Sequence, residues 1–331
     1  MNITAKQIAE MLNVSKQAVY SVLSNKPKCL VSPEKREKIL FLAKAYHYKK
    51  NISAVSLNGK STNQIGVVID SFATTEARII SNLASKLDME NYLLKVSKIT
   101  SVPQGIETIN NYISSGVDAV IFSGLRLNDI RHEDFPIPLL SLGGEFTSDY
   151  FSGSRKVTEH LIREHGHRKI LHVASEAGEF PKYLGYCEAM KNAGLEVLPV
   201  LHTILNPNFG DELKKYLDNG VTAFVVSGDG KASRLIYFLR SMGLRVPEDV
   251  AVVGFDGFGN YPEITSVFNP INEIAAVGCE MLLQKIRENI LHRLDVRCVE
   301  PGLRTSRSCG CAPLEFDNIA MFYSENGLVS R

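Results

Sequence analysis

The sequence predicts an N-terminal all-α helix-turn-helix domain followed by an α/β core with two doubly wound parallel sheets. Capped helical segments fill the first part of the chain, and short apolar runs alternate with helix-length segments after it. This alternation is typical of parallel strands joined by helices. A length of 331 residues also exceeds one compact core, so two or three structural units are expected.

Charge is divided unevenly between these parts. Residues 1–60 contain 11 Lys and Arg against three Asp and Glu, whereas residues 61–331 contain 26 against 33. The formal net charge of +1 therefore combines a head of +8 with a body of −7, the asymmetry expected when one end meets a polyanion. Neither a membrane-spanning stretch nor the apolar core of a signal peptide is visible, so we expect a cytoplasmic protein.

The first two helices are predicted from their caps. Thr4 and Gln7 have the spacing of a capping box, so a helix of about eight residues should begin at Thr4. Asn13 tolerates a left-handed turn, and Ser15 can cap a second helix. Within residues 5–24, the small, turn-forming and branched residues stand where a helix-turn-helix needs them.

The second helix has a predicted inner and outer side. Its core-facing residues are expected to be Val19, Val22 and Leu23. The start and exposed face, where base edges would be read, consists of Lys16, Gln17, Tyr20 and Ser21. Gln17 can contact adenine with two hydrogen bonds, and Lys16 can reach guanine or a phosphate. Because short matches to this motif arise by chance, solvated surface residues remain an alternative.

A third helix is predicted at Ser32, which can cap it, with Pro33 at the first helical position. It should run to about Tyr46 and pack three apolar residues onto the first two helices: Ile39, Leu40 and Ala43. Residues 51–60 are compatible with a further short helix. Ten residues cannot hold a helix alone in water, so we expect this one to order only against a partner.

The body contains five continuous apolar runs that predict buried parallel strands: Ile65–Ile69, Ala119–Phe122, Ile170–Val173, Ala223–Val226 and Val250–Val253. Helix-length segments between them include Ala77–Glu90, Val157–His165 and Lys182–Ala193. Five such strands over this length favour two consecutive sheets. In sheets of this kind, ligands bind beyond the carboxyl ends of the strands.

The residues just past predicted strand ends include Ser71, Phe72, Asp229 and Asp256. Carboxylates beside an aromatic side chain suit the hydroxyls and the apolar side of a sugar ring. For each acid the alternative is a loop residue that caps a helix or ties down a turn.

No motif favours an enzyme, a cofactor or a metal. There is neither a Gly-x-Gly-x-x-Gly after a strand nor a Gly-x-Ser-x-Gly turn. The six cysteines are scattered, as expected for reduced thiols. Cys309-Gly310-Cys311 resembles half a metal clamp without a second pair of matching spacing. His165-Gly166-His167 could hold a metal, but Gly166 is better explained as a helix end.

Taken together, residues 3–70 resemble the N-terminus of the LacI/GalR family of bacterial transcription regulators. The motifs are Ile8-Ala9, Val14-Ser15, Val19, Val31-Ser32-Pro33, Arg36-Glu37-Lys38-Ile39 and Gly66-Val67-Val68-Ile69, and similarity extends over nearly the entire chain. The resemblance implies a DNA-binding domain over 1–50, a hinge helix over 51–61, a two-lobed periplasmic-binding-protein-like core over 62–314 and a tail over 315–331. It places lobe 1 at 62–158 and 270–297, and lobe 2 at 159–269 and 298–314.

The resemblance also implies site residues. Those implied to bind DNA are Thr4, Ser15, Lys16, Gln17, Tyr20, Ser21, Ser32, Tyr48, Asn51, Ala54 and Leu57. Leu57 matches the hinge-helix leucine that wedges into the minor groove. Those implied to bind an effector are Ser71, Phe72, Lys182, Asp229, Asp256 and Asn269.

The function implied is that of a homodimeric repressor. Two heads would read a pseudo-palindromic operator on double-stranded DNA, and a small molecule, a sugar or sugar derivative, would control them. The protein would be associated with the nucleoid when bound to DNA. Lys182 stands where the family usually has an arginine, which leaves an acidic sugar or sugar phosphate open as effector. The alternatives are a solute-binding protein without DNA function and a sugar-active enzyme.

Overall fold

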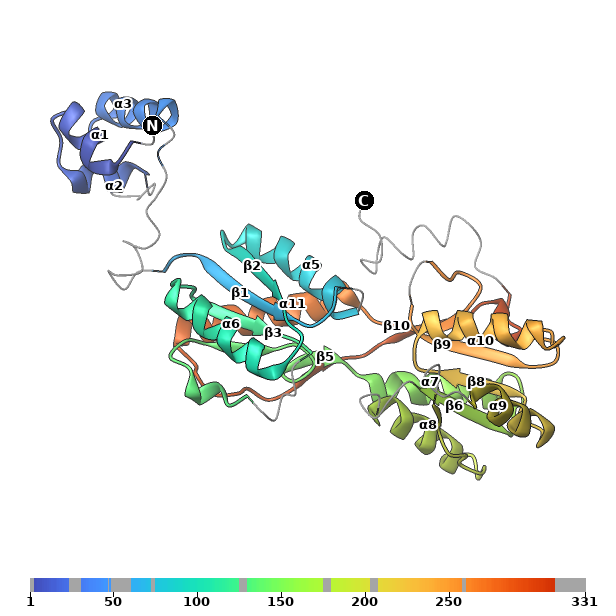
Figure 1. Ribbon diagram of the computed structural model, residues 1–331. Helices are drawn as coiled ribbons and strands as arrows, with labels where there is room; N and C mark the ends of the chain where they lie inside the picture. The colour runs from blue at the N-terminus through green and yellow to red at the C-terminus, as the bar shows by residue number, and fades with distance from the viewer. Residues whose placement is uncertain are drawn as a thin grey trace. The chain divides into compact units, whose positions relative to one another are not determined.

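The structure is a computed structural model, coloured along the chain in Figure 1. It divides into two units, Met1–Thr62 and Asn63–Arg331. The residues that it describes are 3–23, 31–46, 48, 61–72, 75–124, 130–174, 180–202, 208–257 and 260–312. Residues 51–60 of the predicted hinge helix (51–61) and the whole predicted tail (315–331) lie outside the described residues. Among the described helices, none has the length and apolar character needed to cross a membrane.

The described residues of the first unit form three helices: α1 (Ala5–Met11), α2 (Lys16–Leu23) and α3 (Pro33–Ala45). The predicted capping box is present, since the Thr4 N–H donates to Gln7 Oε1 at 2.9 Å and the Gln7 N–H donates to Thr4 Oγ1 at 3.3 Å. Asn13 adopts φ 49° in the turn, and the Ala18 N–H donates to Ser15 Oγ at 3.1 Å. These local choices agree with the predicted boundaries.

The core of this unit is small and apolar. It consists of Ala5, Ile8, Ala9, Val19, Val22 and Ile39. The prediction for Leu40 is wrong, because its side chain is 44% exposed. Ile39 already fills the one inward position on that turn of α3, and a neighbouring residue on a helix points about 100° away.

The second unit contains two parallel sheets. The four-stranded sheet has the order β2-β1-β3-β4, and we call it and its helices the first lobe. Its strands are β1 (Gln64–Ile69), β2 (Leu93–Lys98), β3 (Ala119–Phe122) and β4 (Leu139–Ser141). Its helices are α5 (Thr75–Met89), α6 (Val102–Ser114) and α11 (Ile271–Glu288). Helices α5 and α11 pack on one face and α6 on the other (Figure 1).

The second lobe is built on a six-stranded sheet with the order β12-β10-β9-β8-β6-β7, in which β12 alone is antiparallel. Its strands are β6 (Ile170–Ala174), β7 (Leu201–His202), β8 (Ala223–Val226), β9 (Ala251–Asp256), β10 (Thr265–Phe268) and β12 (Gly302–Arg304). Helices α7 (Tyr150–Arg163) and α8 (Phe180–Asn192) cover one face. Helices α9 (Phe209–Asp218) and α10 (Asp229–Ser241) cover the other.

All five predicted strands are present, and their residues are almost completely buried, as expected for parallel strands covered on both faces. The chain passes between the lobes three times: through β5 (Phe146–Ser148) and β11 (Arg297–Val299), which pair in parallel, and between the end of β10 at Phe268 and the start of α11 at Ile271. Helix α7 packs on the six-stranded sheet through Val157 and Leu161. The first crossing therefore lies before Tyr150, earlier than the expected position near residue 158.

A buried ion pair holds the start of β5 in the first lobe. Lys285 Nζ at the end of α11 lies 2.9 Å from Glu145 Oε1, and neither side chain has any exposed surface. The second carboxylate oxygen accepts hydrogen bonds from Ser141 N and Oγ at 2.9 and 3.1 Å. Lys285 Nζ also donates to the His292 carbonyl at 2.7 Å. Burial lowers the pKa of Lys285, although Glu145 beside it favours the charged form.

Replacing Lys285 by Met should lower the free energy of unfolding by about 3–5 kcal/mol, because Glu145 would remain buried without its cation. Chemical denaturation of the full chain measures this. The matched control is Lys214→Met on α9, whose pair with Asp218 is exposed and should change stability by less than about 1 kcal/mol. Equal losses in the two variants would contradict a structural role for the buried pair.

Candidate functional site

The exposed face of α2 is where the sequence places it. Ser15, Lys16, Gln17 and Tyr20 are exposed, and Ser21 is half-buried, while Val19 and Val22 anchor the opposite side in the core. Lys16 Nζ lies 5.7 Å from the centre of the Tyr20 ring. The helix thus presents a cation, an amide and an aromatic hydroxyl on one surface. Such a set can bind phosphates and base edges.

Three of the other predicted DNA-binding residues have local structural roles as well. Thr4 and Ser32 cap α1 and α3. Tyr48 is half-buried, and its backbone N–H donates to the Ala43 carbonyl at 2.8 Å. Burial raises the pKa of Tyr48, with a smaller contribution from Tyr20 nearby. The remaining three, Asn51, Ala54 and Leu57, lie outside the described residues.

In the second lobe, Lys182 and Asp256 meet at the carboxyl edge of the sheet. Lys182 Nζ, in the first turn of α8, donates to the Ser227 carbonyl at 2.7 Å and lies 3.7 Å from Asp256 Oδ1. The ammonium group also lies 4.1 Å from the centre of the Phe255 ring and 5.2 Å from that of Tyr150. Aromatic faces attract a cation, so the lysine is held in place by both charge and packing.

Asp256 has an unusual backbone conformation at the end of β9. Its φ is 96°, a value that non-glycine residues rarely adopt, and Gly257 follows at φ 68°. A Cβ atom on Gly257 would lie 2.2 Å from Phe268 Cβ, so only glycine fits this turn. The carboxylate of Asp256 remains 19% exposed. Strained residues of this kind cluster where a structure binds a ligand.

Asp229 supports the same turn from beneath. It begins α10, is fully buried, and accepts a hydrogen bond from Ser266 Oγ at 2.6 Å. Ser266 Oγ in turn accepts one from the Gly257 N–H at 3.1 Å. These contacts match the alternative in which the acid ties down a turn. Its buried carboxylate positions Asp256 through Ser266 and Gly257.

Asn269 is fully buried next to this cluster. It follows Phe268, which is the register partner of Asp256 in the parallel pair of β10 and β9. Within the described part of the chain, neither amide atom of Asn269 has a hydrogen-bond partner. A buried amide without partners is costly, and a bound polar molecule would remove that cost.

Ser71 and Phe72 are not part of this cluster. They follow β1 at the corresponding edge of the first lobe, where Phe72 is 59% exposed. Tyr150, which the sequence reasoning missed, lies beside Lys182, whose ammonium group is 5.2 Å from the centre of its ring. Burial raises its pKa well above the ordinary value, and the carboxylates of Glu76 in the first lobe and Asp256 in the second raise it further. Tyr150 is the first residue of α7 and follows its cap, Asp149. In the sequence this position looks like an ordinary helix start, so nothing there indicated a site.

Comparisons with known proteins cover both units of the chain. A periplasmic binding protein-like domain model matches residues 158–309. Catabolite control protein A of Priestia megaterium is 26% identical over 90% of this chain and 99% of its own length. The ribose operon repressor of Halalkalibacterium halodurans is 28% identical over 87% and 92%. A lac repressor dimer bound to operator and the anti-inducer ONPF has the same fold, with a TM-score of 0.77, 21% identity and coverage of 93% and 99%.

These comparisons support the resemblance of the chain to the LacI/GalR family. Its periplasmic-binding-like core is the part matched by the domain model, and the helix-turn-helix unit extends the similarity toward the N-terminus. The predicted resemblance and the predicted fold class are thereby confirmed. The assignment of individual DNA-binding and effector-binding residues stays a prediction.

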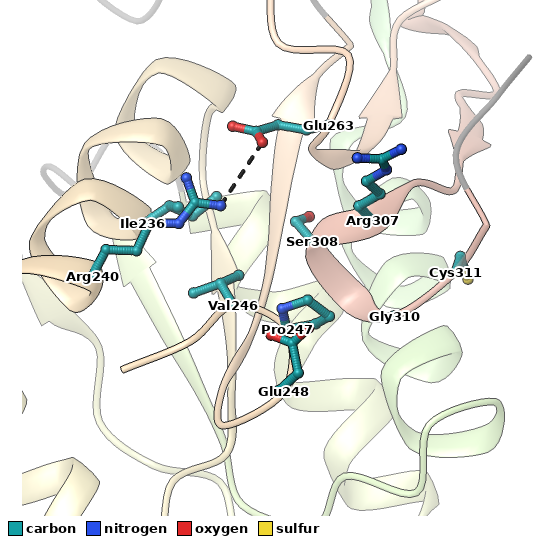
Figure 2. A pocket seen from close by; sticks show the side chains of 10 residues that line it. All are labelled: Ile236, Arg240, Val246, Pro247, Glu248, Glu263, Arg307, Ser308, Gly310 and Cys311. Carbon is teal, nitrogen blue, oxygen red and sulfur yellow. Dashed lines mark ion pairs between the residues drawn. The ribbon is translucent and has the colours of Figure 1, made fainter. Parts of the chain in front are cut away.

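The core also has a pocket of about 380 Å³ away from the Lys182 cluster. Figure 2 shows Arg240 and Glu263 paired across one side of it and Arg307, Gly310 and Cys311 on the other. Its lining comes from the end of α10, the segment before β9 and the segment after β12. The pocket therefore lies at the amino edge of the six-stranded sheet, opposite to the edge where the sequence predicts an effector.

The close approach at Gly257 can be tested with a matched pair of variants. Gly257→Ala and Gly194→Ala both place a Cβ at a positive φ, 68° and 67°, but only Gly194 has open space around it. Gly194→Ala should cost about 1–2 kcal/mol of unfolding free energy for its conformation alone. Gly257→Ala should cost about 1–3 kcal/mol more because of the clash with Phe268. Equal costs in chemical denaturation would contradict the close approach.

Proposed function

We propose that the protein is a sequence-specific, DNA-binding repressor of transcription whose DNA affinity is controlled by a small molecule. One observation supports this above all. A capped helix-turn-helix unit and a core with a polar cluster at the strand ends occur in one chain, and relatives named as a repressor and a control protein align with both parts.

The basic head supplies the DNA-binding part of the proposal. Its charge of +8 would displace counterions from the phosphates, and Lys16 and Gln17 would read base edges in the major groove. Asn51, Ala54 and Leu57 would act in the hinge, with Leu57 as a wedge in the minor groove. Because one head covers few base pairs, the repressor would bind as a homodimer on a pseudo-palindrome.

The effector would bind at the Lys182 cluster and reach toward the first lobe. Asp256 offers a partly exposed carboxylate, and Phe255 and Tyr150 offer apolar faces. Asn269 offers an amide that has no hydrogen-bond partner within the described part of the chain. These groups suit a polyhydroxylated molecule such as a sugar. Since Lys182 already faces Asp256, the positive charge is balanced within the site, which favours a neutral sugar over a sugar acid. Ser71 and Phe72 would contact it from the other lobe.

Control would follow from the two-lobed architecture. The core would have two states that differ in how far the lobes close about β5 and β11, and an effector held between the strand edges would favour one of them. The difference in effector affinity between these two states would set the change in operator affinity. The protein would act by binding and not by turnover, in the cytoplasm on the nucleoid. The +8 head distinguishes it from a solute-binding protein with a similar core.

Gln17→Ala should weaken binding to the preferred operator by about 1–3 kcal/mol, because a two-pronged base contact is lost. Binding to an unrelated duplex should change little, whereas Lys16→Ala should weaken both through the lost charge. The operator is first selected from random duplexes, and affinities are measured by fluorescence anisotropy at one salt concentration. If Gln17→Ala weakened both duplexes equally, base reading by Gln17 would be excluded.

Lys182→Ala should abolish the response to effector while leaving operator binding in its absence unchanged. The probe is the compound, from a panel of neutral sugars, sugar acids and sugar phosphates, that alters the operator affinity of the wild type. Lys191→Ala, an exposed position on the same helix, is the matched control and should respond normally. A full response from Lys182→Ala would place the effector elsewhere.

A further inference from the structure

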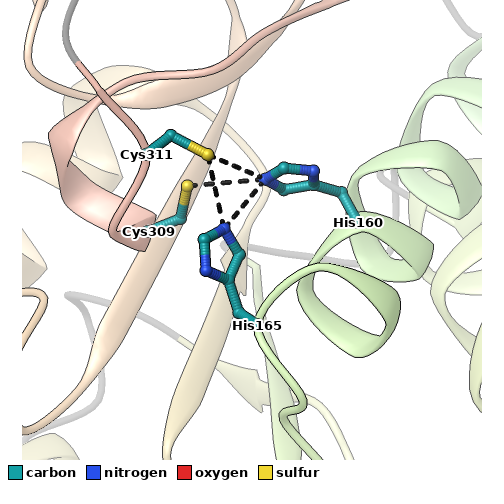
Figure 3. A group of neighbouring side chains, drawn as sticks. All are labelled: His160, His165, Cys309 and Cys311. Carbon is teal, nitrogen blue, oxygen red and sulfur yellow. Dashed lines mark hydrogen bonds between the residues drawn. The ribbon is translucent and has the colours of Figure 1, made fainter.

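Four sulfur and nitrogen donors meet at the amino edge of the second lobe. They are His160 in the last turn of α7, His165 just beyond it, and Cys309 and Cys311 in the segment after β12. Their ligating atoms all lie within 4.8 Å of one another, although nearly 150 residues of chain separate the histidines from the cysteines. Figure 3 shows the four side chains pointing toward a common centre.

The distances between the donors fit one tetrahedral ion. His160 Nε2 lies 3.2 Å from His165 Nε2 and 3.5 Å from both sulfur atoms. Cys311 Sγ lies 3.4 Å from His165 Nε2. Zinc bonds of about 2.3 Å to sulfur and 2.0–2.1 Å to nitrogen give tetrahedral edges of about 3.3 Å between nitrogens and about 3.5 Å between nitrogen and sulfur. The four side chains therefore need no large movement to enclose the ion.

The local backbone explains how both thiols reach the same point. Arg307–Cys309 form a short 3-10 helix, and Gly310 follows at φ 100°, which a side chain would disfavour. This turn directs Cys309 and Cys311 to one side. Thr265 Oγ1 lies 2.9 Å from Cys309 Sγ and donates to the Ser306 carbonyl at 2.9 Å. With a metal-bound thiolate beside it, the hydroxyl would donate to the sulfur instead, as outer groups at metal sites do.

His167 is not part of the cluster, because its Nδ1 lies 2.9 Å from Thr222 Oγ1. The partner of His165 in the cluster is therefore His160 and not His167. The sequence interpretation considered each of the two motifs alone and expected no metal. The structure brings Cys309 and Cys311 together with His165 and with His160, which neither motif contained.

We propose that His160, His165, Cys309 and Cys311 bind a structural Zn²⁺ ion. Two imidazoles and two thiolates suit zinc better than hard cations, and four protein ligands leave no open position for catalysis. The ion fixes the segment after β12 to the end of α7. It lies at the amino edge of the sheet, opposite to Lys182, so it stabilises the second lobe without taking part in effector binding.

The first test is the metal content of the full-length, untagged protein purified without chelators. The wild type is expected to contain about one zinc ion per chain. Cys311→Ser and His165→Ala should lose it, while the matched controls Cys298→Ser and His167→Ala should keep it. Loss of zinc from His167→Ala as complete as that from His165→Ala would overturn the assignment.

The second test needs no variant and so does not depend on variants that fold. Zinc is removed from the reduced wild type with a chelator and replaced by Co²⁺. We expect the intense visible bands of tetrahedral Co²⁺ together with a thiolate charge-transfer band, and a higher melting temperature in the metal-bound protein than in the metal-free one. A spectrum of octahedral Co²⁺, or no bound metal in either test, would overturn the proposal.

Discussion

The ion pair of Glu145 and Lys285 fixes the point at which the chain leaves the first lobe. Both groups are fully buried, so the pair is tolerable only because other polar groups complete its hydrogen bonds. Glu145 Oε1 also accepts from the Leu294 N–H at 2.8 Å, and the Arg297 N–H donates to the Glu145 carbonyl at 2.7 Å. The starts of β5 and β11 are thereby held at one place, and the second lobe connects to the first through strands anchored there.

The same principle of completed polar contacts operates at the carboxyl edge of the second lobe. Asp229, Ser266 and Gly257 form a buried chain of hydrogen bonds that fixes the turn bearing Asp256. Lys182 faces Asp256 from α8. Asn269 is the exception, since its amide has no partner in the described part of the chain. A site prepared for a polar ligand is expected to look like this, with rigid supports and one unmet group.

Sequence reasoning predicted what depends on local chemistry or strong periodicity. The caps at Thr4 and Ser15 and the five buried strands are set by nearby residues, and all are present. The edge strand β2 was missed because its burial is irregular, with Leu93 64% exposed. The crossing strands β5 and β11 have only three residues each, too few for a pattern.

The parts of the sites that escaped prediction depend on residues far apart in the chain. No spacing rule connects Ser266 to Asp229 or Tyr150 to Asp256. The same holds for His160, which lies one helical turn and a loop before His165. It meets its cysteines only after the chain has left the second lobe for α11 and returned through β11. Local motifs can identify donor types, but their grouping is set by the sheet topology.

The two edges of the six-stranded sheet suggest a division of labour in control by effector. A ligand at the carboxyl edge can move the second lobe as a unit only if that lobe is internally stiff, since a compliant lobe would absorb the change. Bound zinc at the amino edge joins α7, which starts directly after the β5 crossing, to the segment that follows the β11 crossing and β12. The segments that follow β5 and β11 would then be tied to one rigid body, and closure would be confined to the three connections between the lobes: β5, β11 and the residues between β10 and α11.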